Sequence, residues 1–282
     1  MPTYRLCGEL IESEVELTRV RPVCATTRPS LRVARVRPGV AVSGVVHRIP
    51  DVCVFWVDAD RVWVEPGDGV SDAELSTALV GPILAVWLHL HRRVLCLHAS
   101  AARIANVACL FAGDCGAGKS TIARAMIDHG CTVWGDDLSV IDLERLELVP
   151  THPELRLWPS SLARFPEDYP SSVAFEGLDK RAIAVDDAFE RQGAPLAHIF
   201  LIEQGDRVAV VPATTAEAVH GLVRHTWGSL LLGYAMHDPS VHLDRVASVM
   251  SAARAWRLVR TADLTDLPAV VAAVFEVVES SP

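Results

Sequence analysis

The spacing of hydrophobic and polar residues divides the chain into a strand-rich first part and a second part that mixes strands with helices. In the first part, apolar runs at 52–57 and 61–64 flank the polar segment 58–60, which predicts a β-hairpin. From 71 to 91, apolar residues recur at helical spacing, and either Ser71 or Asp72 would cap the helix. We therefore expect a β-rich amino-terminal part followed by a helical connector.

The second part opens with two short and fully apolar runs, 94–97 and 108–112. Runs of this kind are typical of central strands that are covered on both faces. Residues 119–129 then follow a helical pattern that ends at Gly130, and 131–134 is the next strand candidate. This succession of strands and helices predicts the α/β class.

The rest of the pattern predicts further strands and helices around a loop-rich middle. Four prolines, Pro153, Pro159, Pro166 and Pro170, punctuate the region after residue 150, so we expect loops there. The other expected elements are a hairpin of 138–143 with 146–149, a strand pair of 197–203 with 207–211 around Gly205, helices at 215–232 and 241–255, a strand at 256–260, and a final helix at 268–278.

The composition is that of a globular protein rather than a disordered one. Of the 282 residues, 50% are hydrophobic and 22% are charged, which allows a substantial core. The length suits either one large domain or a core domain with a smaller partner. We place a β-rich domain with its connector at 1–92 and the core domain at 93–282. The formal net charge of −9 and the lack of a long basic run argue against nucleic-acid binding.

Cysteine usage and the apolar stretches favour a cytoplasmic protein. The seven cysteines are odd in number and form no C-x-x-C pair, and most have apolar neighbours, as buried free thiols do. No charged segment followed by an apolar run opens the sequence, so we expect no signal peptide. The longest apolar stretch, 80–90, is interrupted by Pro82 and His89 and is too short to span a bilayer, so we expect no membrane partner.

An arginine-rich stretch at 19–37 is the exception to the acidic balance. The spacing of Arg32, Arg35 and Arg37 resembles strand positions. The stretch is interpreted as a solvated strand face, with a peptide-contact surface as the alternative.

One glycine-rich segment carries a pattern with a defined chemistry. Residues 113–120 read Gly-Asp-Cys-Gly-Ala-Gly-Lys-Ser, which satisfies G-x-x-x-x-G-K-[ST] between a predicted strand and a predicted helix. Glycines let backbone N–H groups point inward around phosphate oxygens, and the helix adds its positive amino-terminal end. Lys119 would reach the β- and γ-phosphates, and the Ser120 hydroxyl would bind Mg²⁺. The predicted nucleotide-binding residues are Gly113, Asp114, Cys115, Gly116, Ala117, Gly118, Lys119, Ser120 and Thr121.

Two adjacent carboxylates follow the third strand candidate. Asp136 and Asp137 lie one helix and one strand after the glycine-rich segment. Neighbouring residues on an extended backbone point in opposite directions. One carboxylate would therefore bind the metal while the other accepts a hydroxyl proton, the base role in kinase-type transfer. The alternative is a surface turn after Gly135.

His98 ends the apolar run that precedes the strand of the glycine-rich segment. Such a histidine is either a satisfied core residue or, beside a phosphate site, a group that orients or charge-stabilises the aspartate. The candidate catalytic residues are thus Asp136, His98 and Lys119.

The run from His98 through Asp137 resembles the catalytic domain of the HPr kinase/phosphorylase family. That family combines a histidine, a strand, a GDSG-x-GKS loop, and a pair of aspartates one helix and one strand later. The resemblance covers roughly the last two thirds of the chain. It implies the P-loop fold that the family shares with phosphoenolpyruvate carboxykinase, and phosphorylation of a protein serine with ATP and Mg²⁺.

The resemblance also implies roles for single residues. Asp136 would be the proton acceptor or donor with His98 close by, and Asp137 would support the metal. Glu154 lies in Glu-Leu-Arg, which looks like the family's later E-x-R element, whose glutamate assists Mg²⁺. The alternative for Glu154 is an ordinary loop carboxylate. The implied metal ligands are Ser120, Asp137 and Glu154.

Two departures from the family pattern bear on function. Cys115 replaces the serine of GDSG, and a thiol beside a helix amino terminus is prone to oxidation or alkylation, which would block the site. Residues 157–159, Leu-Trp-Pro, stand where the bifunctional enzymes have a glycine-rich stretch. This difference calls into question both HPr as the substrate and a phosphorylase activity.

The chain is more similar to a divergent branch of HPr-kinase-like proteins. That branch has a β-rich amino-terminal part, an L-R-L-W segment (155–158 here), a K-R pair (Lys180 and Arg181), and an R-H-x-W segment (224–227). Some members phosphorylate the carboxy-terminal serine of a lasso-peptide precursor. Arg156, Lys180 and Arg181 would neutralise the transferring phosphoryl group or contact the acceptor, with ordinary surface charge as the alternative.

These observations favour a Mg-ATP-dependent kinase that phosphorylates a serine of a peptide or small protein. A small-molecule kinase, for a free amino acid for example, and a nucleotide-binding regulatory module with little turnover are the alternatives. The acceptor stays open, as does the choice among ATP, GTP and pyrophosphate as donor. HPr-kinase relatives form hexamers, so a homo-oligomer is one of the options for the assembly.

Overall fold

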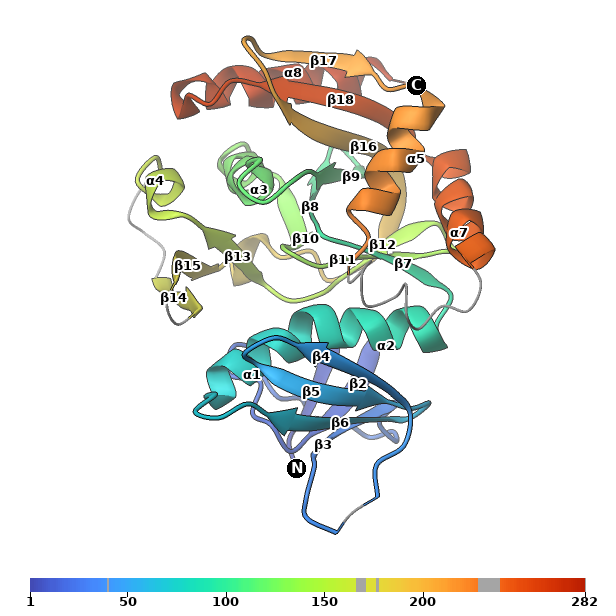
Figure 1. The fold of residues 1–282 in the computed structure, drawn as a ribbon. Helices are drawn as coiled ribbons and strands as arrows, with labels where there is room; N and C mark the ends of the chain where they lie inside the picture. Colours follow the sequence, from blue (N-terminus) through green and yellow to red (C-terminus); the bar gives the residue numbers. More distant parts are fainter. Residues whose placement is uncertain (40, 166–170, 176–177, 228–238, 282) are drawn as a thin grey trace. The chain divides into compact units, whose positions relative to one another are not determined.

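The computed structural model describes residues 1–282 except 40, 166–170, 176–177, 228–238 and 282 (Figure 1). Within these residues the protein is a mixed α/β structure with several sheets. The chain divides into two compact units, which we call the amino-terminal unit and the core unit. The amino-terminal unit contains 1–93 and Trp227, and the core unit contains 94–226 and 239–281.

The amino-terminal unit is built on a six-stranded sheet. In sheet order, its strands are β1 (Thr3–Leu6), β2 (Glu9–Ser13), β3 (Leu31–Arg35), β6 (Arg61–Pro66), β5 (Cys53–Val57) and β4 (Val45–Ile49). β5 and β6 pair antiparallel around 58–60, which confirms the predicted hairpin. Buried and half-buried side chains alternate along β5, because successive side chains on a strand point to opposite faces.

A helical segment follows this sheet, as predicted. It consists of α1 (Asp72–Ala78), the π-helical turn η1 (Leu79–Ile83) and α2 (Leu84–His91). Ser71 begins it with a capping box, in which the Ser71 hydroxyl accepts from the Glu74 N–H and the Glu74 carboxylate accepts from the Ser71 N–H.

Pro82 bends this helical segment without ending it, so the apolar helix is longer than the stretch 80–90 considered above. Asp72–His91 is long and apolar enough to cross a membrane by length and composition. However, 78% of its most apolar window is buried inside the folded chain. Burial of this kind is typical of a core helix.

Arginines near β3 form ion pairs with acidic residues of the same unit. Arg32 lies 3.0 Å from a Glu12 carboxylate oxygen, and Arg37 lies 2.8 Å from one of Glu14. Both pairs are partly exposed, and such pairs contribute about 0–1 kcal/mol each. This arrangement agrees with the solvated strand face.

The core unit is built on a nine-stranded sheet. Along its main path the strands are β10 (Thr132–Gly135), β8 (Ala99–Ile104), β9 (Val107–Ala112), β16 (Ala194–Gln204), β12 (Glu147–Val149), β11 (Ser139–Asp142) and β7 (Val94–Leu97). β18 (Arg254–Arg260) pairs parallel with β16, and β17 (Ala209–Pro212) pairs antiparallel with β18.

The central strands β9 and β16 run parallel, and β9 is covered on both faces, as its apolar run predicts. The other apolar run forms β7, which is buried but lies at the end of the main path beside β11, so the central position expected for it is wrong. Along β9, Cys109 and Phe111 belong to one buried cluster, while Ala108, Leu110 and Ala112 belong to another. The first cluster includes residues of α3 (Lys119–Asp128) and α8 (Leu267–Ser280), and the second includes residues of α5 (Thr215–Arg224) and α7 (Pro239–Ala252). Helices therefore cover both faces of the sheet (Figure 1).

Two details of this sheet differ from the prediction. The segments 197–203 and 207–211 are strands, but they do not pair with each other, because β18 lies between β16 and β17. The strand β8 is absent from the prediction, because its run of small residues, Ala99 to Ala102, carries little of the β-branched and aromatic signal of a strand. The hairpin of β11 with β12 is confirmed.

The helix predicted at 215–232 ends at Arg224. It stops there because the carbonyl oxygen of His225 accepts a hydrogen bond from the backbone N–H of His98, at 2.7 Å, which ties the chain to the end of β7. The remainder of that prediction, 228–232, lies outside the described residues. The predicted helices that correspond to α3, α7 and α8 are confirmed.

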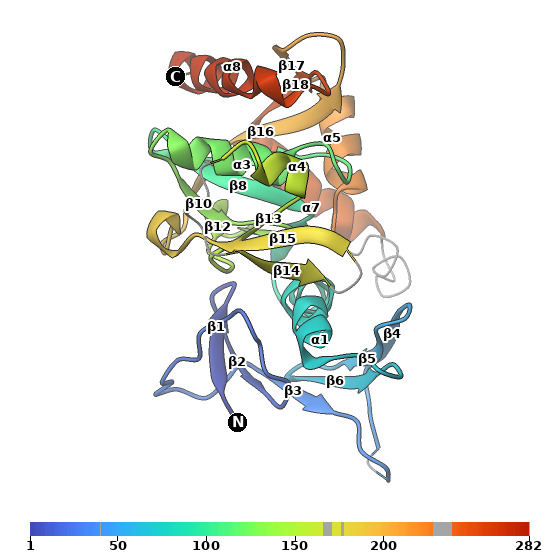
Figure 2. The ribbon, with the colours of Figure 1, turned by 90° about the vertical axis from the view of Figure 1, so that its left-hand side faces the viewer.

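The region after residue 150 contains a small sheet rather than only loops (Figure 2). Pro153 and Pro159 flank its first strand instead of interrupting it, so the strand keeps its N–H donors. Pro166 and Pro170 lie outside the described residues. The elements of this region are β13 (Glu154–Leu157), α4 (Pro159–Leu162), β14 (Ser171–Phe175), β15 (Leu178–Ala184) and the 3-10 turn η2 (Asp186–Ala188), with β15 between β13 and β14.

Candidate functional site

The glycine-rich segment forms the connection between β9 and α3, which is the strand, loop and helix order that the sequence predicts. Gly116 and Gly118 have φ values of +79° and +105°, a backbone region that favours glycine. A Cβ atom on Gly118 would lie 3.0 Å from Nε of Arg260. Glycine at this position therefore serves both the turn and the close approach of an arginine.

Lys119 is the first residue of α3 and is 5% exposed. Its Nζ donates to the carbonyl oxygens of Gly113 at 2.9 Å and Asp114 at 3.2 Å, so the side chain folds back over the loop. Burial lowers the pKa of Lys119, while the charges of Asp136 and Asp137 act in the opposite direction. The ammonium group and the two aspartates therefore lie within electrostatic range of one another.

Two arginines that the sequence analysis does not single out hold the loop in place. Arg260, at the end of β18, donates to the carbonyl oxygens of Ala117 at 2.6 Å and Gly116 at 3.3 Å. Arg224, at the end of α5, donates twice to the Asp114 carboxylate, at 3.0 and 2.8 Å. Arg224 does occur in the R-H-x-W segment, whereas no local sequence signal marks Arg260.

A sharp bend after β10 directs the aspartate pair into the core unit. Gly135 has a φ of +131°, and a Cβ atom there would lie 2.0 Å from Oγ1 of Thr151. Asp137 also has a positive φ, +63°. Asp136 and Asp137 are 1% and 7% exposed, so the pair is not the surface turn considered as an alternative.

Both carboxylate oxygens of Asp136 accept hydrogen bonds. The Ser100 hydroxyl, from β8, donates to Oδ1, and the backbone N–H of Arg156, from β13, donates to Oδ2 at 2.9 Å. Ser100 is fully buried and was not foreseen, because the strand that carries it was not predicted. Each oxygen keeps a second lone pair, so Asp136 can still accept a proton.

Asp137 lies among basic side chains. Its Oδ2 accepts from Nη1 of Arg156 at 3.0 Å, and its Oδ1 lies 3.6 Å from Nζ of Lys180 and 4.0 Å from Nε2 of His98. Burial alone would raise the pKa of this carboxyl, but Arg156, Lys180, His98 and Lys119 together lower it to about 2. Asp137 is therefore an anion at neutral pH.

Glu154 lies on the strand β13 and is 5% exposed, so it is not a loop carboxylate. Its Oε1 accepts from Nε of Arg156 at 2.8 Å. Burial would lower the pKa of Arg156, but Asp137 and Glu154 raise it. The guanidinium of Arg156 thus bridges the two carboxylates that the resemblance assigns to the metal. Removing one partner of such a buried group leaves the others uncompensated.

His98 is half-buried beside these groups. Burial and then Lys119 lower the pKa of His98, against the opposing effect of Asp137 and Asp136. His98 is therefore neutral at pH 7, which suits a hydrogen-bonding group better than a fixed cation.

The charged side chains described so far form one cluster, which consists of His98, Lys119, Asp136, Asp137, Glu154, Arg156 and Lys180. Not every predicted residue lies in this cluster. Lys180 on β15 approaches Asp137, whereas the next residue, Arg181, is exposed, because adjacent residues of a strand face opposite ways. Thr121 directs its hydroxyl to Oγ of Ser161 at 3.0 Å. Cys115 is exposed and forms no disulfide.

The two lysines of the chain, Lys119 and Lys180, both belong to the cluster. All other basic side chains that carry a permanent charge are arginines. A lysine ammonium is a compact charge with three rotatable donors, which suits contacts with several phosphate oxygens.

Only a few protein ligands are needed for this site to hold Mg²⁺. Among the residues that the structure describes, no three His, Cys, Asp or Glu side chains form a group that could hold a metal ion. Mg²⁺ needs no such group, because it keeps several waters and binds substrate phosphates with one or two carboxylates. By their chemistry, the Ser120 hydroxyl and one carboxylate, of Asp137 or Glu154, would supply such donors, and the ion would displace part of the contact with Arg156.

The low pKa of Asp137 predicts a loss of stability in acid. Its pKa is about 2 in the folded protein against an ordinary value of 3.8, so the stabilisation is present above pH 4 and disappears as pH falls towards 2. The full effect is about 2 kcal/mol, of which about 1 kcal/mol is lost by pH 3. We expect urea unfolding from pH 5 to pH 3 to show a weaker pH dependence in Asp137→Asn than in the wild type.

The matched control for this experiment is Asp206→Asn, which alters an exposed aspartate in the turn after β16. It should follow the wild-type pH dependence. Equal slopes for Asp137→Asn and the wild type would contradict the assignment of this stabilisation to Asp137.

Comparisons with known proteins add a remote similarity. Neither a family model nor a curated protein matches this chain. Among solved structures, the HPr(Ser) kinase/phosphatase from Coxiella burnetii matches with 12% sequence identity and a TM-score of 0.33, over 65% of this chain and 96% of that chain. Identity and TM-score at this level establish neither a shared fold nor a shared activity, so function has to be argued from the residues of the site.

Proposed function

We propose that the chain is a Mg-ATP-dependent kinase that phosphorylates a serine hydroxyl of a peptide or small protein. The observation that carries this proposal is that Lys119, Asp136 and Asp137 are all buried in the core unit, where the charges of the two aspartates act on the Lys119 ammonium group. The loop that begins at Gly113 supplies a phosphate-binding pattern, and Asp136 supplies a base. A kinase needs both within one site.

The proposed reaction uses these residues in distinct roles. Asp136 accepts the proton of the serine hydroxyl while the serine oxygen forms a bond to the γ-phosphorus and the bond to the β,γ-bridging oxygen breaks, which releases ADP. Lys119 compensates the charge on the phosphates. Mg²⁺, held by Ser120 and a carboxylate, would neutralise the same charge when bound.

The cations around Asp137 suit the same reaction. Arg156 and Lys180 lie within 3.0 and 3.6 Å of its carboxylate, so their position is set before any substrate binds. Groups fixed in this way need little rearrangement as charge develops in the transition state. His98 is neutral and close to Asp137, where it would orient the acceptor or the carboxylate.

A nucleotide-binding module with little turnover is the second candidate. It is favoured by the hydrogen bonds that Asp136 already accepts from Ser100 and from the N–H of Arg156. These two donors hold the carboxylate in a fixed position inside the core unit, which also suits a structural role without turnover.

The experiment that tests the proposal is mass spectrometry of peptides incubated with the protein and Mg-ATP. Peptides with an internal serine, peptides with a carboxy-terminal serine, as in a lasso-peptide precursor, and free serine form the three arms. We expect phosphate on a peptide serine and none on the matching alanine peptide. Phosphorylation of free serine alone would identify a small-molecule kinase. Nucleotide binding with no acceptor modified in any arm would favour the regulatory module.

A further inference from the structure

One residue of the glycine-rich loop, Asp114, brings a negative charge to a segment that would bind phosphates. Its carbonyl oxygen accepts hydrogen bonds from the N–H of Ala117 at 3.0 Å and from Nζ of Lys119 at 3.2 Å, so its backbone is part of the loop. Its carboxylate lies within electrostatic range of the Lys119 ammonium group. The phosphates of a nucleotide carry several negative charges, so an uncompensated carboxylate at this position would repel them.

Arg224, the last residue of α5, compensates the charge of Asp114. Its Nε and Nη2 donate to the two carboxylate oxygens at 3.0 and 2.8 Å, a bidentate contact that fixes both groups. This contact lowers the pKa of Asp114, so the carboxylate is an anion at neutral pH and the pair carries no net charge. The two residues are 110 positions apart in the chain, so folding creates the pair.

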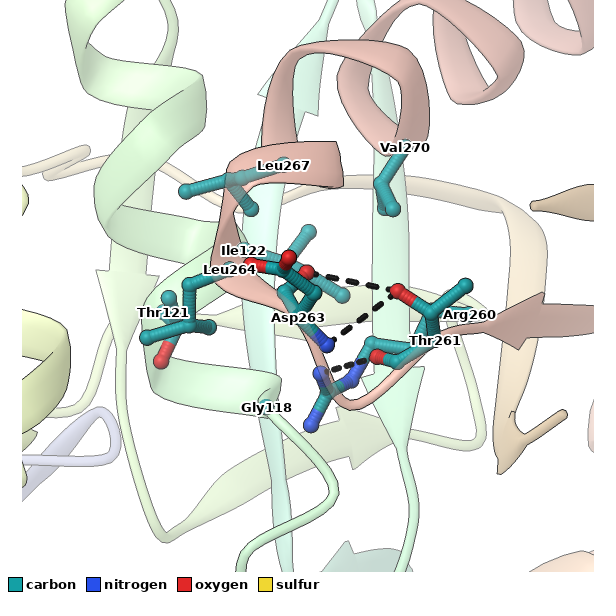
Figure 3. A pocket seen from close by; sticks show the side chains of 9 residues that line it. All are labelled: Gly118, Thr121, Ile122, Arg260, Thr261, Asp263, Leu264, Leu267 and Val270. Carbon is teal, nitrogen blue, oxygen red and sulfur yellow. Dashed lines mark hydrogen bonds between the residues drawn. The ribbon is translucent and has the colours of Figure 1, made fainter. Parts of the chain in front are cut away.

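Three other basic side chains near the loop leave this role to Arg224. Lys119 donates to carbonyl oxygens of the loop and is the group that would bind the phosphates. Burial lowers the pKa of His225 to about 4, so this side chain is neutral at pH 7. Arg260, which lies beside the start of α3 (Figure 3), donates to other carbonyl oxygens of the loop. Among the residues that the structure describes, only Arg224 donates a side-chain hydrogen bond to the Asp114 carboxylate.

The residues that follow α5 fix Arg224 in place. The carbonyl oxygen of His225 accepts from the N–H of His98 at 2.7 Å, and Thr226 forms a β-bridge with Leu97. The Thr226 hydroxyl also donates to a carbonyl oxygen in the last turn of α5, at 2.9 Å. The end of α5 is thereby tied to the end of β7, so the guanidinium of Arg224 is positioned before any nucleotide binds.

We propose that Arg224 is a positioning residue for nucleotide binding, which neutralises Asp114 and thereby lets the loop accept a polyphosphate. The inference rests on the proposed function, since it assumes that the phosphates bind at Lys119. It adds to that site a residue that lies outside the G-x-x-x-x-G-K-[ST] pattern. The side chains of Arg224 and Asp114 are 55% and 64% exposed, and exposed pairs contribute little to stability, so variants of the pair should fold.

The first test is the affinity of Arg224→Ala for Mg-ATP, measured by isothermal titration calorimetry on the full chain. We expect the dissociation constant to rise on the order of tenfold, because the carboxylate of Asp114 then repels the phosphates. Arg224→Lys should lose less affinity, because it keeps the charge without the bidentate contact. The ratio between the dissociation constants of Arg224→Ala and the wild type should shrink from about 0.1 M to about 1 M salt, because the screening length falls from about 10 Å to about 3 Å.

A double variant separates the charge of Arg224 from its role as a tether. Asp114→Asn combined with Arg224→Ala removes both charges and leaves the contact between the loop and α5 broken. We expect this variant to bind Mg-ATP within about threefold of the wild type, because no carboxylate remains to repel the phosphates. A double variant that binds as weakly as Arg224→Ala would show that the arginine only tethers the loop, and would overturn the inference. Wild-type affinity in Arg224→Ala would overturn it as well.

The matched control is Arg257→Ala, which removes another exposed bidentate arginine of the core unit. Arg257 on β18 donates to Glu203 at 3.1 and 2.8 Å and lies 3.4 Å from Glu217 near the start of α5. This variant should keep the wild-type affinity for Mg-ATP. An equal loss in Arg257→Ala would attribute the effect to the placement of α5 and would overturn the inference. Failure of the wild type itself to bind Mg-ATP would overturn the phosphate site at Lys119 and this inference with it, so the two failures are distinguishable.

Discussion

Replacing Lys119 with alanine is expected to abolish nucleotide binding. The side chain is the cation at the first position of α3, and its ammonium group is already directed over the loop by the carbonyl oxygens of Gly113 and Asp114. A bound nucleotide would replace those neutral acceptors with charged phosphate oxygens, which form stronger hydrogen bonds. Loss of this contact in a buried site should weaken Mg-ATP binding by at least on the order of 100-fold. Titration calorimetry with Mg-ATP measures the change.

Because Lys119 is buried, its removal also affects the folded loop. Lys119→Met retains the apolar stem without the charge, and it should fail to bind Mg-ATP while unfolding at a temperature close to that of the wild type. Arg207→Ala is the charge-matched control, since it removes an exposed cation in the turn after β16. Wild-type affinity for Mg-ATP in Lys119→Met would refute the phosphate site.

Asp136→Asn is expected to retain nucleotide binding and to lose phosphoryl transfer. Removal of a general base typically lowers the rate by about 10²- to 10⁴-fold. The amide oxygen can accept from the N–H of Arg156, and the amide NH₂ can donate to the Ser100 hydroxyl, which turns to accept it. The hydrogen-bond network survives this substitution, so the expected loss is chemical rather than structural.

The transfer rate should be measured in a single turnover with saturating Mg-ATP and an acceptor peptide that the mass-spectrometry experiment identifies. Asp206→Asn, at the exposed turn after β16, is the control and should react at the wild-type rate. If Asp136→Asn transfers phosphate as fast as the wild type, Asp136 is not the base. If it binds Mg-ATP poorly, the carboxylate belongs to the nucleotide site instead.

These two variants also separate the proposed functions. A kinase requires both Lys119 and Asp136, whereas a regulatory nucleotide-binding module requires Lys119 alone. Both residues are buried, so each experiment needs a control for fold stability. The unfolding temperature provides it for Lys119→Met, and retained Mg-ATP binding provides it for Asp136→Asn. The combination of lost transfer with retained binding is therefore specific to the kinase.

Elements that depend on neighbouring residues were predictable from the sequence alone. The helix cap at Ser71, the hairpin around 58–60 and the loop that begins at Gly113 each involve residues close together in the chain. Backbone propensity, side-chain periodicity and local hydrogen bonds determine such elements. The type of chemistry at the loop follows from the same local pattern.

Sheet order and the partners of buried charges were decided only by the tertiary structure. Arg260 contacts the carbonyl of Ala117 across 143 positions, and Ser100 contacts Asp136 across 36. No periodicity along the chain determines which cation a carboxylate meets, because that depends on which strands become neighbours. The sequence by itself thus determined the phosphate-binding pattern and the aspartate pair. Folding decided that Arg156 bridges Asp137 and Glu154, since burial leaves ionised groups no water to solvate them and requires partners of opposite charge.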